Sequence, residues 1–437
     1  MFETIVALAT PPLKSALAVI RLSGSDCFKI VSKVFTKDLA INPKRDIHFG
    51  YIVDGDKQVD QVILLTYVNP HSFTGEDSVE VICHGSPLIA NQIISLLLKN
   101  GARMATSGEF SSRAYLNGKI DLVQAEAIND LINSTTIEAK DLSMISMSGE
   151  TSKMFKPIKE QIAEILSLIE VNIDYPEYED IEQVTKDKII EVCGDIVDKI
   201  DKLIIDGERS RLYREGLKIA IVGKPNVGKS SLLNSLIKDD KAIVTDIAGT
   251  TRDIVEGDFN LCGVPCHLFD TAGLRESEDV IEKIGINKSV NAINDADLVI
   301  FVVDESGLDK DLYNLVKDKK HILVTNKADL ISNKDKNNIY ISAKNNDIEP
   351  LLNKIKEITD IGVIKVKPTF NNTRQLGLLK NISNRLNIAI KDAKDDQPID
   401  LISVSIMSAY NSALDLVGEN NKNDLTDEIF SRFCVGK

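Results

Sequence analysis

The chain has 437 residues, which is too long for one compact core, so two or three domains are expected. Its formal net charge is −14, which argues against a general nucleic-acid coat protein, because non-specific affinity comes from neutralising phosphates. Any contact with RNA must therefore be local or shared with a basic partner. The six scattered cysteines predict free thiols and a cytoplasmic protein. No secretory signal pattern or bilayer-spanning apolar run is found, so no membrane association is expected.

Residues 1–118 predict an α+β domain. Apolar and β-branched runs predict strands over residues 4–9, 16–22, 61–68 and 78–83. Residues 89–99 have the apolar spacing of a helix.

Residues 119–212 and 371–437 predict a helical domain, because glycine and proline become sparse and apolar residues recur at helical spacing. Pro157 is predicted to stand at a helix start. Two stripes are expected to be core: Ile158, Ile162, Ile165 and Ile169, then Leu379, Ile382, Leu386 and Ile390. Since residues 216–367 alternate between strands and helices, the simplest interpretation is an α/β domain inserted into a discontinuous helical one.

A phosphate-binding loop is the first of five ordered motifs in the inserted domain. The predicted strand over residues 217–222 leads into residues 223–230, with sequence GKPNVGKS, and then into a helix over residues 231–237. Strand, glycine-rich turn and helix is the context that such a loop requires. Backbone N–H groups would cradle phosphates, Lys229 would reach the β and γ phosphates, and Ser230 would ligate Mg²⁺.

The next two motifs are GTTRD at residues 249–253 and DTAG at residues 270–273, the latter at the end of a predicted strand over residues 264–269. Thr251 is a candidate to complete the Mg²⁺ shell, although alone it would be taken for a polar loop residue. Asp270 suits an acidic position near Mg²⁺, and the Gly273 N–H can meet the γ-phosphate.

The last two motifs predict guanine recognition. NKAD at residues 326–329 follows a predicted strand over residues 321–325, and SAK occupies residues 342–344. Asp329 can accept from N1–H and the exocyclic amine of guanine, a donor pair that adenine lacks. The Ala343 N–H can contact the guanine carbonyl. A GTP-binding, Ras-like P-loop domain is therefore predicted.

The catalytic group is less clear from these residues. Leu274 occupies the position of the water-orienting glutamine of Ras-like enzymes and cannot orient water. Glu282 is the best substitute, although from the residues alone a solvated helix carboxylate is favoured. Cys262 and Cys266, next to His267, lack the partners of a zinc site, so a structural strand position is favoured.

Both ends of the chain carry further motifs. The amino-terminal part contains Ala9-Thr10-Pro11-Pro12, the segment SFTGED at residues 72–77 and RAYLNGKIDL at residues 113–122, and the chain ends in FCVGK at residues 433–437. With the GTPase motifs, this combination closely resembles the MnmE (TrmE) family of tRNA modification GTPases over essentially the whole chain.

The resemblance implies an amino-terminal domain that binds a tetrahydrofolate one-carbon donor (5-formyl or 5,10-methylene) and mediates homodimerisation. It implies a K⁺-activated GTPase that, in a heterotetramer with an FAD/NADH-dependent partner, adds an aminomethyl or carboxymethylaminomethyl group to carbon 5 of the wobble uridine in certain tRNAs. No G-x-G-x-x-G follows a strand in this chain, which is consistent with redox chemistry supplied by a partner.

The resemblance also assigns residues. Glu282 becomes the catalytic carboxylate, with Lys229 and Cys434 as further catalytic positions. Cys434 is equally open to a role as nucleophile and to one as a buried residue that fixes the tail. Folate positions are Arg21, Glu80, Lys119 and Lys437. Metal positions are Ser230 and Thr251 for Mg²⁺, and Asn226, Thr245, Ile247 and Thr250 for K⁺. The full predicted GTP set is Asn226, Val227, Gly228, Lys229, Ser230, Ser231, Thr245, Asp246, Ile247, Ala248, Gly249, Thr250, Thr251, Asp270, Thr271, Ala272, Gly273, Asn326, Lys327, Asp329, Ser342, Ala343 and Lys344.

Two other functions stay open at this point. A ribosome-assembly or signalling GTPase would share the inserted domain but not the terminal motifs. A self-sufficient folate-dependent transferase would need no redox partner.

Overall fold

The computed structural model describes residues 3–174, 185–238, 257–270, 293–331, 335, 338–362, 367–420, 429–431, 433 and 436, with the backbone alone at 238 and 270. The chain divides into two compact units. One comprises Met1–Ile132, Ser146–Gly194 and Asn384–Lys437, and the other comprises Asn133–Ile145 and Asp195–Ser383.

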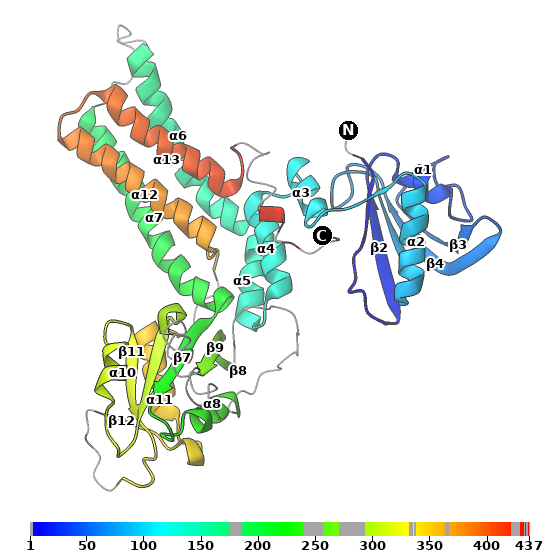
Figure 1. Ribbon diagram of the computed structural model, residues 1–437. Helices are drawn as coiled ribbons and strands as arrows, with labels where there is room; N and C mark the ends of the chain where they lie inside the picture. Colours follow the sequence, from blue (N-terminus) through cyan, green and yellow to red (C-terminus); the bar gives the residue numbers. More distant parts are fainter. Residues whose placement is uncertain are drawn as a thin grey trace. The chain divides into compact units, whose positions relative to one another are not determined.

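The amino-terminal part of the first unit is a six-stranded mixed sheet with order β3-β4-β5-β2-β1-β6 (Figure 1). Its strands are β1 (Ile5–Leu8), β2 (Leu17–Ser23), β3 (Asp46–Asp54), β4 (Lys57–Tyr67), β5 (Ser78–His84) and β6 (Arg103–Met104). Helices α1 (Cys27–Ser32) and α2 (Pro87–Lys99) share one hydrophobic core with the sheet. The four predicted strands and the predicted helix are confirmed as β1, β2, β4, β5 and α2, while β3 was not predicted.

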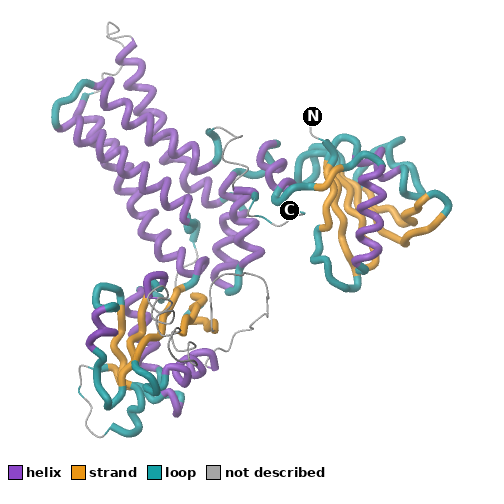
Figure 2. The backbone as a smooth tube through the Cα atoms, in the orientation of Figure 1, coloured by secondary structure: helices purple, strands orange, loops and turns teal. Residues whose placement is uncertain are grey.

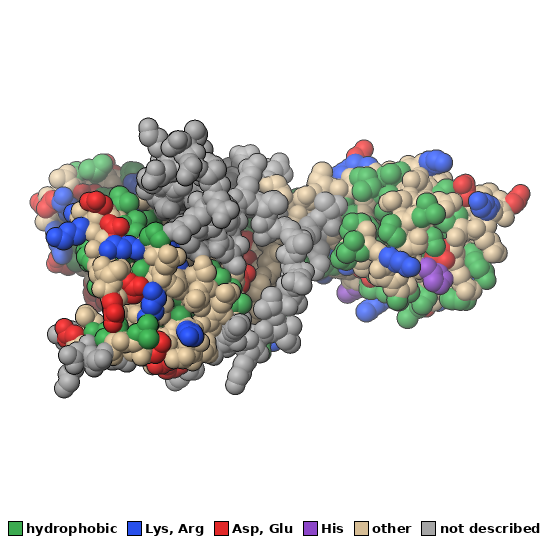
Figure 3. Space-filling model, turned by 60° about the horizontal axis from the view of Figure 1, so that its bottom comes forward, with side chains coloured by type: hydrophobic (Ala, Val, Ile, Leu, Met, Phe, Trp, Pro, Cys, Tyr) green, Lys and Arg blue, Asp and Glu red, His purple; other side chains and the backbone are tan. Residues whose placement is uncertain are grey.

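Alternation along the strands leaves part of one sheet face exposed. In β2, Ile20 and Leu22 are fully buried, and Arg21 between them points to the other face. On that other face, Phe49 of β3 lies opposite Ile63 of β4, and they are 59% and 40% exposed. We call Ile47, Phe49 and Ile63 the open sheet face. Figure 3 shows many hydrophobic side chains on one side of this domain, in the right-hand part of the view.

Seven helices that the structure describes lie outside the two sheet domains. They are α3 (Glu109–Leu116), α4 (Leu122–Asn133), α5 (Ile137–Met147), α6 (Glu150–Asp174), α7 (Lys186–Glu215), α12 (Thr373–Lys394) and α13 (Ile399–Val417) (Figure 2). α6 packs along α13, and the predicted stripe from Ile158 to Ile169 is buried. In the second stripe, Leu379, Ile382 and Leu386 are fully buried. None of the described helices has the length and apolar character needed to cross a membrane.

The predicted helix start at Pro157 is wrong. α6 begins at Glu150 and runs through Pro157. Gly149, with φ of +85°, precedes that start and breaks the preceding helix. The helix tolerates Pro157 in its interior because its apolar stripe packs on both sides of the proline.

The second unit holds a parallel sheet with order β12-β11-β10-β7-β9-β8, in which only β8 pairs antiparallel. Its strands are β7 (Leu217–Gly223), β8 (Gly257–Leu261), β9 (Val264–Asp270), β10 (Leu298–Val303), β11 (His321–Thr325) and β12 (Ile339–Tyr340). Its helical elements are α8 (Lys229–Lys238), α10 (Lys310–Asn314), η1 (Ala343–Asn345) and α11 (Glu349–Thr359). The predicted fold class is confirmed: an α+β amino-terminal domain, helices divided in sequence, and an inserted α/β domain.

The inserted sheet domain is closed at its base. The Tyr213 hydroxyl, near the end of α7, donates to the Gly362 carbonyl at 2.5 Å, so the chain enters and leaves the domain at adjacent points. Helix α5 also contributes to this domain, because Leu142, 4% exposed, belongs to the hydrophobic core that includes Leu217 and Leu232.

Candidate nucleotide and folate sites

The GTPase motifs meet at one edge of the parallel sheet. Residues 223–230 follow β7, residue 270 ends β9, residues 326–329 follow β11 and residues 342–344 follow β12. Because the strands are parallel, their carboxyl ends share this edge, where ligands bind in open α/β sheets. The fold therefore brings together motifs that are more than 100 residues apart in sequence.

The phosphate loop is held from inside by Lys229. This residue is 8% exposed, and its Nζ donates to the carbonyls of Gly223 and Lys224, each at 2.9 Å. The ammonium group therefore lies across the loop, directly before the first turn of α8. Asn226 at the loop tip is exposed and has a φ of +62°, and Ser230 is also exposed.

Gly228 allows two motifs to touch. It has a φ of +95°, and a Cβ built there would lie 2.3 Å from Nδ2 of Asn326. Only glycine fits this approach of backbone to side chain without a shift. The loop has the form that cradles a phosphate group with backbone amides, so the described residues fit the phosphates of a nucleotide.

Asn326 connects three of the motifs. Its buried side-chain Nδ2 donates to the Val227 carbonyl at 2.9 Å, and its Oδ1 accepts from the Ala343 N–H at 3.0 Å. Beside it, the Ser342 hydroxyl donates to Oδ1 of Asp329 at 2.6 Å, which fixes the orientation of that carboxylate. These contacts position the groups that the sequence predicts for guanine.

Asp304 was missed by sequence reasoning. It follows β10 at the same sheet edge, and its Oδ2 accepts from Lys327 Nζ at 2.6 Å. The hydrogen bond from Lys327, and one from Ser306, lower the pKa of Asp304 to about 2. Its place at a strand end was the available signal. Lys327 itself has a φ of +61°, a left-handed conformation that is unusual for lysine.

The remaining predicted positions lie outside the described residues. They are Thr245, Asp246, Ile247, Ala248, Gly249, Thr250, Thr251, Thr271, Ala272, Gly273, Glu282, Cys434 and Lys437, together with the side chain of Asp270. Of the other predicted positions, Ser231 lies in the first turn of α8, and Lys344 lies in η1.

The cysteine pair of the inserted domain is divided by the β8–β9 turn. Cys262 is exposed, Cys266 is buried in β9, and His267 Nδ1 lies 2.8 Å from an oxygen of Asp258. Within the described ranges, no group of three or more histidine, cysteine, aspartate and glutamate side chains is placed to hold a metal ion.

The predicted folate residues converge in part. Arg21 of β2 lies opposite Glu80 of β5, and its Nε donates to Glu80 Oε1 at 2.9 Å. Arg21 also donates to the Gly436 carbonyl at 3.3 Å, and its guanidinium lies over the ring of Phe73, 5.9 Å from the centroid. Gly436 therefore lies against the sheet at this ion pair.

Lys119 reaches the same neighbourhood through a loop. Its Nζ donates to the Pro70 carbonyl at 2.9 Å, and a Cβ at Gly75 would lie 3.2 Å from Lys119 Cγ. Phe73, which lies under Arg21, belongs to that loop. Three polar side chains and an aromatic ring around one end of β2 suit a pterin or a folate carboxylate better than a metal ion.

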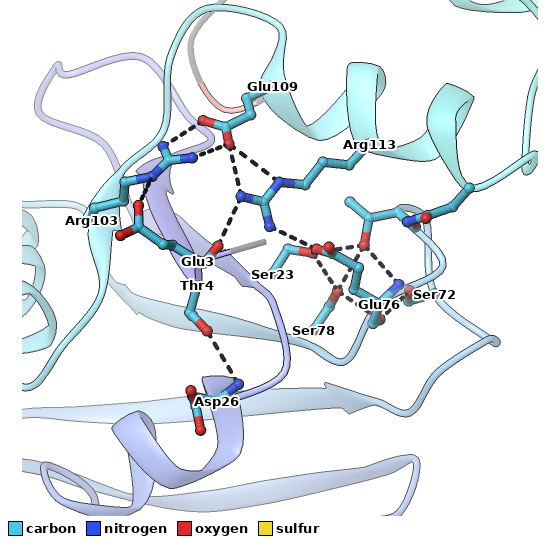
Figure 4. Close-up of polar contacts among 12 residues, drawn as sticks. Glu3, Thr4, Ser23, Asp26, Ser72, Glu76, Ser78, Arg103, Glu109 and Arg113 are labelled. Carbon is cyan, nitrogen blue, oxygen red and sulfur yellow. Dashed lines mark hydrogen bonds and ion pairs between the residues drawn. The ribbon is translucent and has the colours of Figure 1, made fainter. Parts of the chain in front are cut away.

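An arginine network supports this region (Figure 4). Arg113 is 1% exposed, and it donates to Glu109 at 2.8 Å, to Glu76 at 2.9 Å and to the Glu3 carbonyl at 2.8 Å. Arg103 forms two bonds to Glu109, at 2.6 and 2.8 Å. Burial raises the pKa of Glu109, but the bonds from Arg103, the Thr106 N–H and Arg113 outweigh it and bring the value to about 2.

Comparisons with known proteins agree with these features. A family model described as the MnmE helical domain matches residues 122–434, and one described as the GTP-binding protein TrmE N-terminus matches residues 4–119. A tRNA modification GTPase MnmE of Mycoplasmopsis pulmonis is 42% identical over 100% of both chains. Those of Mycoplasma mycoides and Enterococcus faecalis are 41% and 39% identical over 100% of this chain and 99% and 98% of theirs.

Among solved structures, Aquifex aeolicus Era is 28% identical, covers 38% of this chain and 65% of its own, and superposes with a TM-score of 0.27. The two family models together match nearly all of the chain, and the relatives match it from end to end. The chain belongs to the MnmE family of tRNA modification GTPases.

Proposed function

We propose that this protein hydrolyses GTP in the inserted domain of residues 216–367 and uses that reaction in modifying tRNA. The observation that carries the proposal is the meeting of phosphate loop, NKAD and SAK segments through the side chain of Asn326. Residues 1–118 form the folate-binding and dimerisation domain, and residues 119–212 and 371–437 form the helical domain.

Nucleotide binding follows from the sheet edge. Lys229 and the amides of residues 226–231 hold the phosphates, and Asp329 recognises guanine with the Ala343 N–H. Ser230 and Thr251 ligate Mg²⁺, which supplies positive charge to the phosphate oxygens when bound. Residues 245–251 and 270–273 complete the site around the γ-phosphate.

We assign catalysis to Glu282, which positions the attacking water in place of the glutamine that Leu274 replaces. Asn226, Thr245, Ile247 and Thr250 are proposed to hold K⁺, which supplies the positive charge that an arginine finger supplies elsewhere. The exposed position of Asn226 at the loop tip, with its φ of +62°, supports this assignment.

The carbon donor is a tetrahydrofolate derivative, 5-formyl or 5,10-methylene, bound by Arg21, Glu80, Lys119 and Lys437. The hydrogen bond from Arg21 to the Gly436 carbonyl supports this site, because it places Gly436 at the ion pair. Cys434 is then a candidate nucleophile or a residue that fixes the tail beside the folate.

The protein acts as a homodimer with an FAD/NADH-dependent partner in a heterotetramer. The open sheet face supports self-association, because monomers rarely leave side chains such as Phe49, 59% exposed, together on one surface. The target is carbon 5 of the wobble uridine, which receives an aminomethyl or carboxymethylaminomethyl group. The place of action is the cytoplasm, without a membrane.

The decisive test is mass spectrometry of wobble nucleosides in tRNA from cells that lack the gene and from cells in which it is restored. Loss and rescue of the carbon-5 group is expected. Unchanged wobble uridines would contradict the proposal and favour a ribosome-assembly or signalling switch. Stable co-sedimentation of the protein with ribosomal subunits would support that alternative.

Two purified variants and one ion comparison test the assigned residues. Glu282→Ala should abolish hydrolysis while GTP binding persists, and hydrolysis should be faster in K⁺ than in Na⁺. Glu80→Gln should weaken binding of 5-formyltetrahydrofolate and leave GTP hydrolysis unchanged. Retained hydrolysis in the first variant, or unchanged folate affinity in the last, would remove that residue from its role.

A further inference from the structure

The first unit contains a cavity that the nucleotide assignment does not use and that shares only Lys119 with the folate assignment. It has a volume of about 560 Å³ and lies between the start of α4, the first half of α6 and the end of α13. Its walls include Asp121 and Gln124 from the α4 end, Ser152 from α6 and Gly418 from the α13 end. The Tyr115 hydroxyl donates to the Gly418 carbonyl and closes one side.

Three lysines of α6 line the cavity at a spacing of three residues: Lys153, Lys156 and Lys159. Residues at this spacing lie along one side of a helix, so the ammonium groups form a row. The row is notable in a chain whose formal net charge is −14, because such a chain can contact a polyanion only at a local basic site.

Two of these lysines are free to exchange partners. Lys153 pairs with Glu150 at 2.8 Å, but their side chains are 71% and 52% exposed. Lys156 lies 3.7 Å from Glu160, with exposures of 67% and 53%. Exposed ion pairs of this kind stabilise a protein by less than about 1 kcal/mol, so a phosphate can displace the glutamates. Lys159, 16% exposed, is held more firmly by Glu419 at 2.6 Å.

The interior of the cavity also favours an anion. The Ser152 hydroxyl oxygen is buried and makes no hydrogen bond of regular geometry with any described group. Burial raises the pKa of Asp121, and hydrogen bonding from the Gln124 N–H and interaction with Ser152 only partly offset that rise.

We propose that this cavity binds a backbone phosphate of the RNA substrate, with Lys153 and Lys156 contacting the phosphate and the Ser152 hydroxyl donating to one of its oxygens. The inference rests on the proposed function, which makes tRNA the substrate. A contact of this kind positions RNA without reading its sequence. It supplies the local basic contact that an acidic chain needs to bind tRNA.

The test compares two doubly substituted full-length chains. Lys153→Gln with Lys156→Gln removes the cavity charges. Lys391→Gln with Lys394→Gln is the matched control, because these lysines have the same spacing near the end of α12, are exposed, and do not line the cavity. Glutamine keeps the helix propensity of lysine, so both variants should fold.

Affinity for an unmodified tRNA transcript is measured by fluorescence anisotropy over a series of salt concentrations. The cavity variant should bind about tenfold more weakly, and the negative slope of log association constant against log salt should become shallower by about 1. The control should match the wild type. Ser152→Ala should weaken binding without changing the slope. GTP hydrolysis by each chain alone should be unchanged.

The outcomes separate the cavity from the function on which it rests. Wild-type binding with equal slopes in both double variants would overturn the phosphate site and leave the proposed function standing. Equal losses of tRNA affinity in the two variants would overturn the site as well, because they would show an effect of net charge and not of the cavity. A wild-type chain that binds no tRNA would contradict the proposed function itself.

Discussion

Asn326 joins the phosphate loop to the segment proposed for guanine, because its amide donates to the Val227 carbonyl at 2.9 Å while its carbonyl accepts from Ala343 at 3.0 Å. The residue is 3% exposed. One buried side chain therefore fixes the spacing between the phosphate loop and the segment proposed for guanine.

Asn326→Ala tests this connection. The change leaves a buried carbonyl and a buried N–H without their partner, which should cost about 1–3 kcal/mol of unfolding free energy. Affinity for GDP should fall by more than the loss of stability explains at 25 °C. Nucleotide titration and thermal unfolding are measured on the same preparation. Normal affinity in a destabilised protein would limit Asn326 to a structural role.

Gly228→Ala should separate steric fit from backbone strain. The new Cβ would lie 2.3 Å from Nδ2 of Asn326, at a φ of +95°. Gly307→Ala is the control, since Gly307 has a φ of +79° and no neighbour within 4 Å of its Cβ. Both variants pay strain of about 1 kcal/mol, but only the first should lose GTP affinity, by about tenfold or more. Equal losses would show that strain alone acts.

Glu109 gives the amino-terminal domain an acid-sensitive component. Its pKa of about 2 in the folded chain lies below the ordinary 4.5, so its contribution to stability is complete above about pH 4.5. That contribution disappears as the pH falls from about 4.5 towards 2. Glu109→Gln should cost about 3 kcal/mol at neutral pH, because it leaves buried Arg113 without a full partner.

Denaturant unfolding of wild type and Glu109→Gln between pH 3 and pH 7 checks this prediction. The difference between the two should shrink at the acid end. Glu164→Gln, at an exposed position of α6, should change stability by less than about 0.5 kcal/mol at every pH. A difference that does not vary with pH would contradict the ionic origin of the effect.

Leu142→Ala should destabilise the inserted domain, although the residue lies far from it in sequence. Leu142 is 4% exposed in the core that contains Leu217. Removing a buried leucine side chain costs about 2–5 kcal/mol. Hydrogen exchange of the β7 amides reports the effect locally, with Ile145→Val on the same helix as a milder comparison. Unchanged protection in β7 would mean that α5 contributes little to this core.

Sequence patterns predicted the strands that carry motifs, because those strands are buried apolar runs that stop at a turn. β11 has the predicted bounds of His321–Thr325, and β7 and β9 each extend one residue further than predicted. Strand β3 was missed because its outer residues, such as Ile47, are apolar as well, which hides the two-residue alternation. The start of α6 was misplaced because Pro157 is an ambiguous signal: proline favours the first turn but is accepted where packing holds the helix.

Only the site residues that belong to a local sequence motif could be predicted. Lys229, Asn326 and Asp329 could be identified from local sequence, because their neighbours in the chain are part of the signal. Asp304 and Arg113 could not, because their roles come from partners distant in sequence, Lys327 for Asp304 and Glu76 for Arg113. The pairing of Arg21 with Glu80 depends on strand register, which a single sequence does not reveal.

The bond from Tyr213 to the Gly362 carbonyl has a consequence for how the chain folds. Helices α6 and α13 pack together although more than 200 residues separate them in sequence, and closing so long a loop is slow and entropically costly. Once residues 217–361 have folded with their ends adjacent, the same closure spans a considerably shorter effective loop. The inserted domain thus acts as an internal folding aid, and variants that delay its folding should trap the helical halves apart, exposed to aggregation during synthesis.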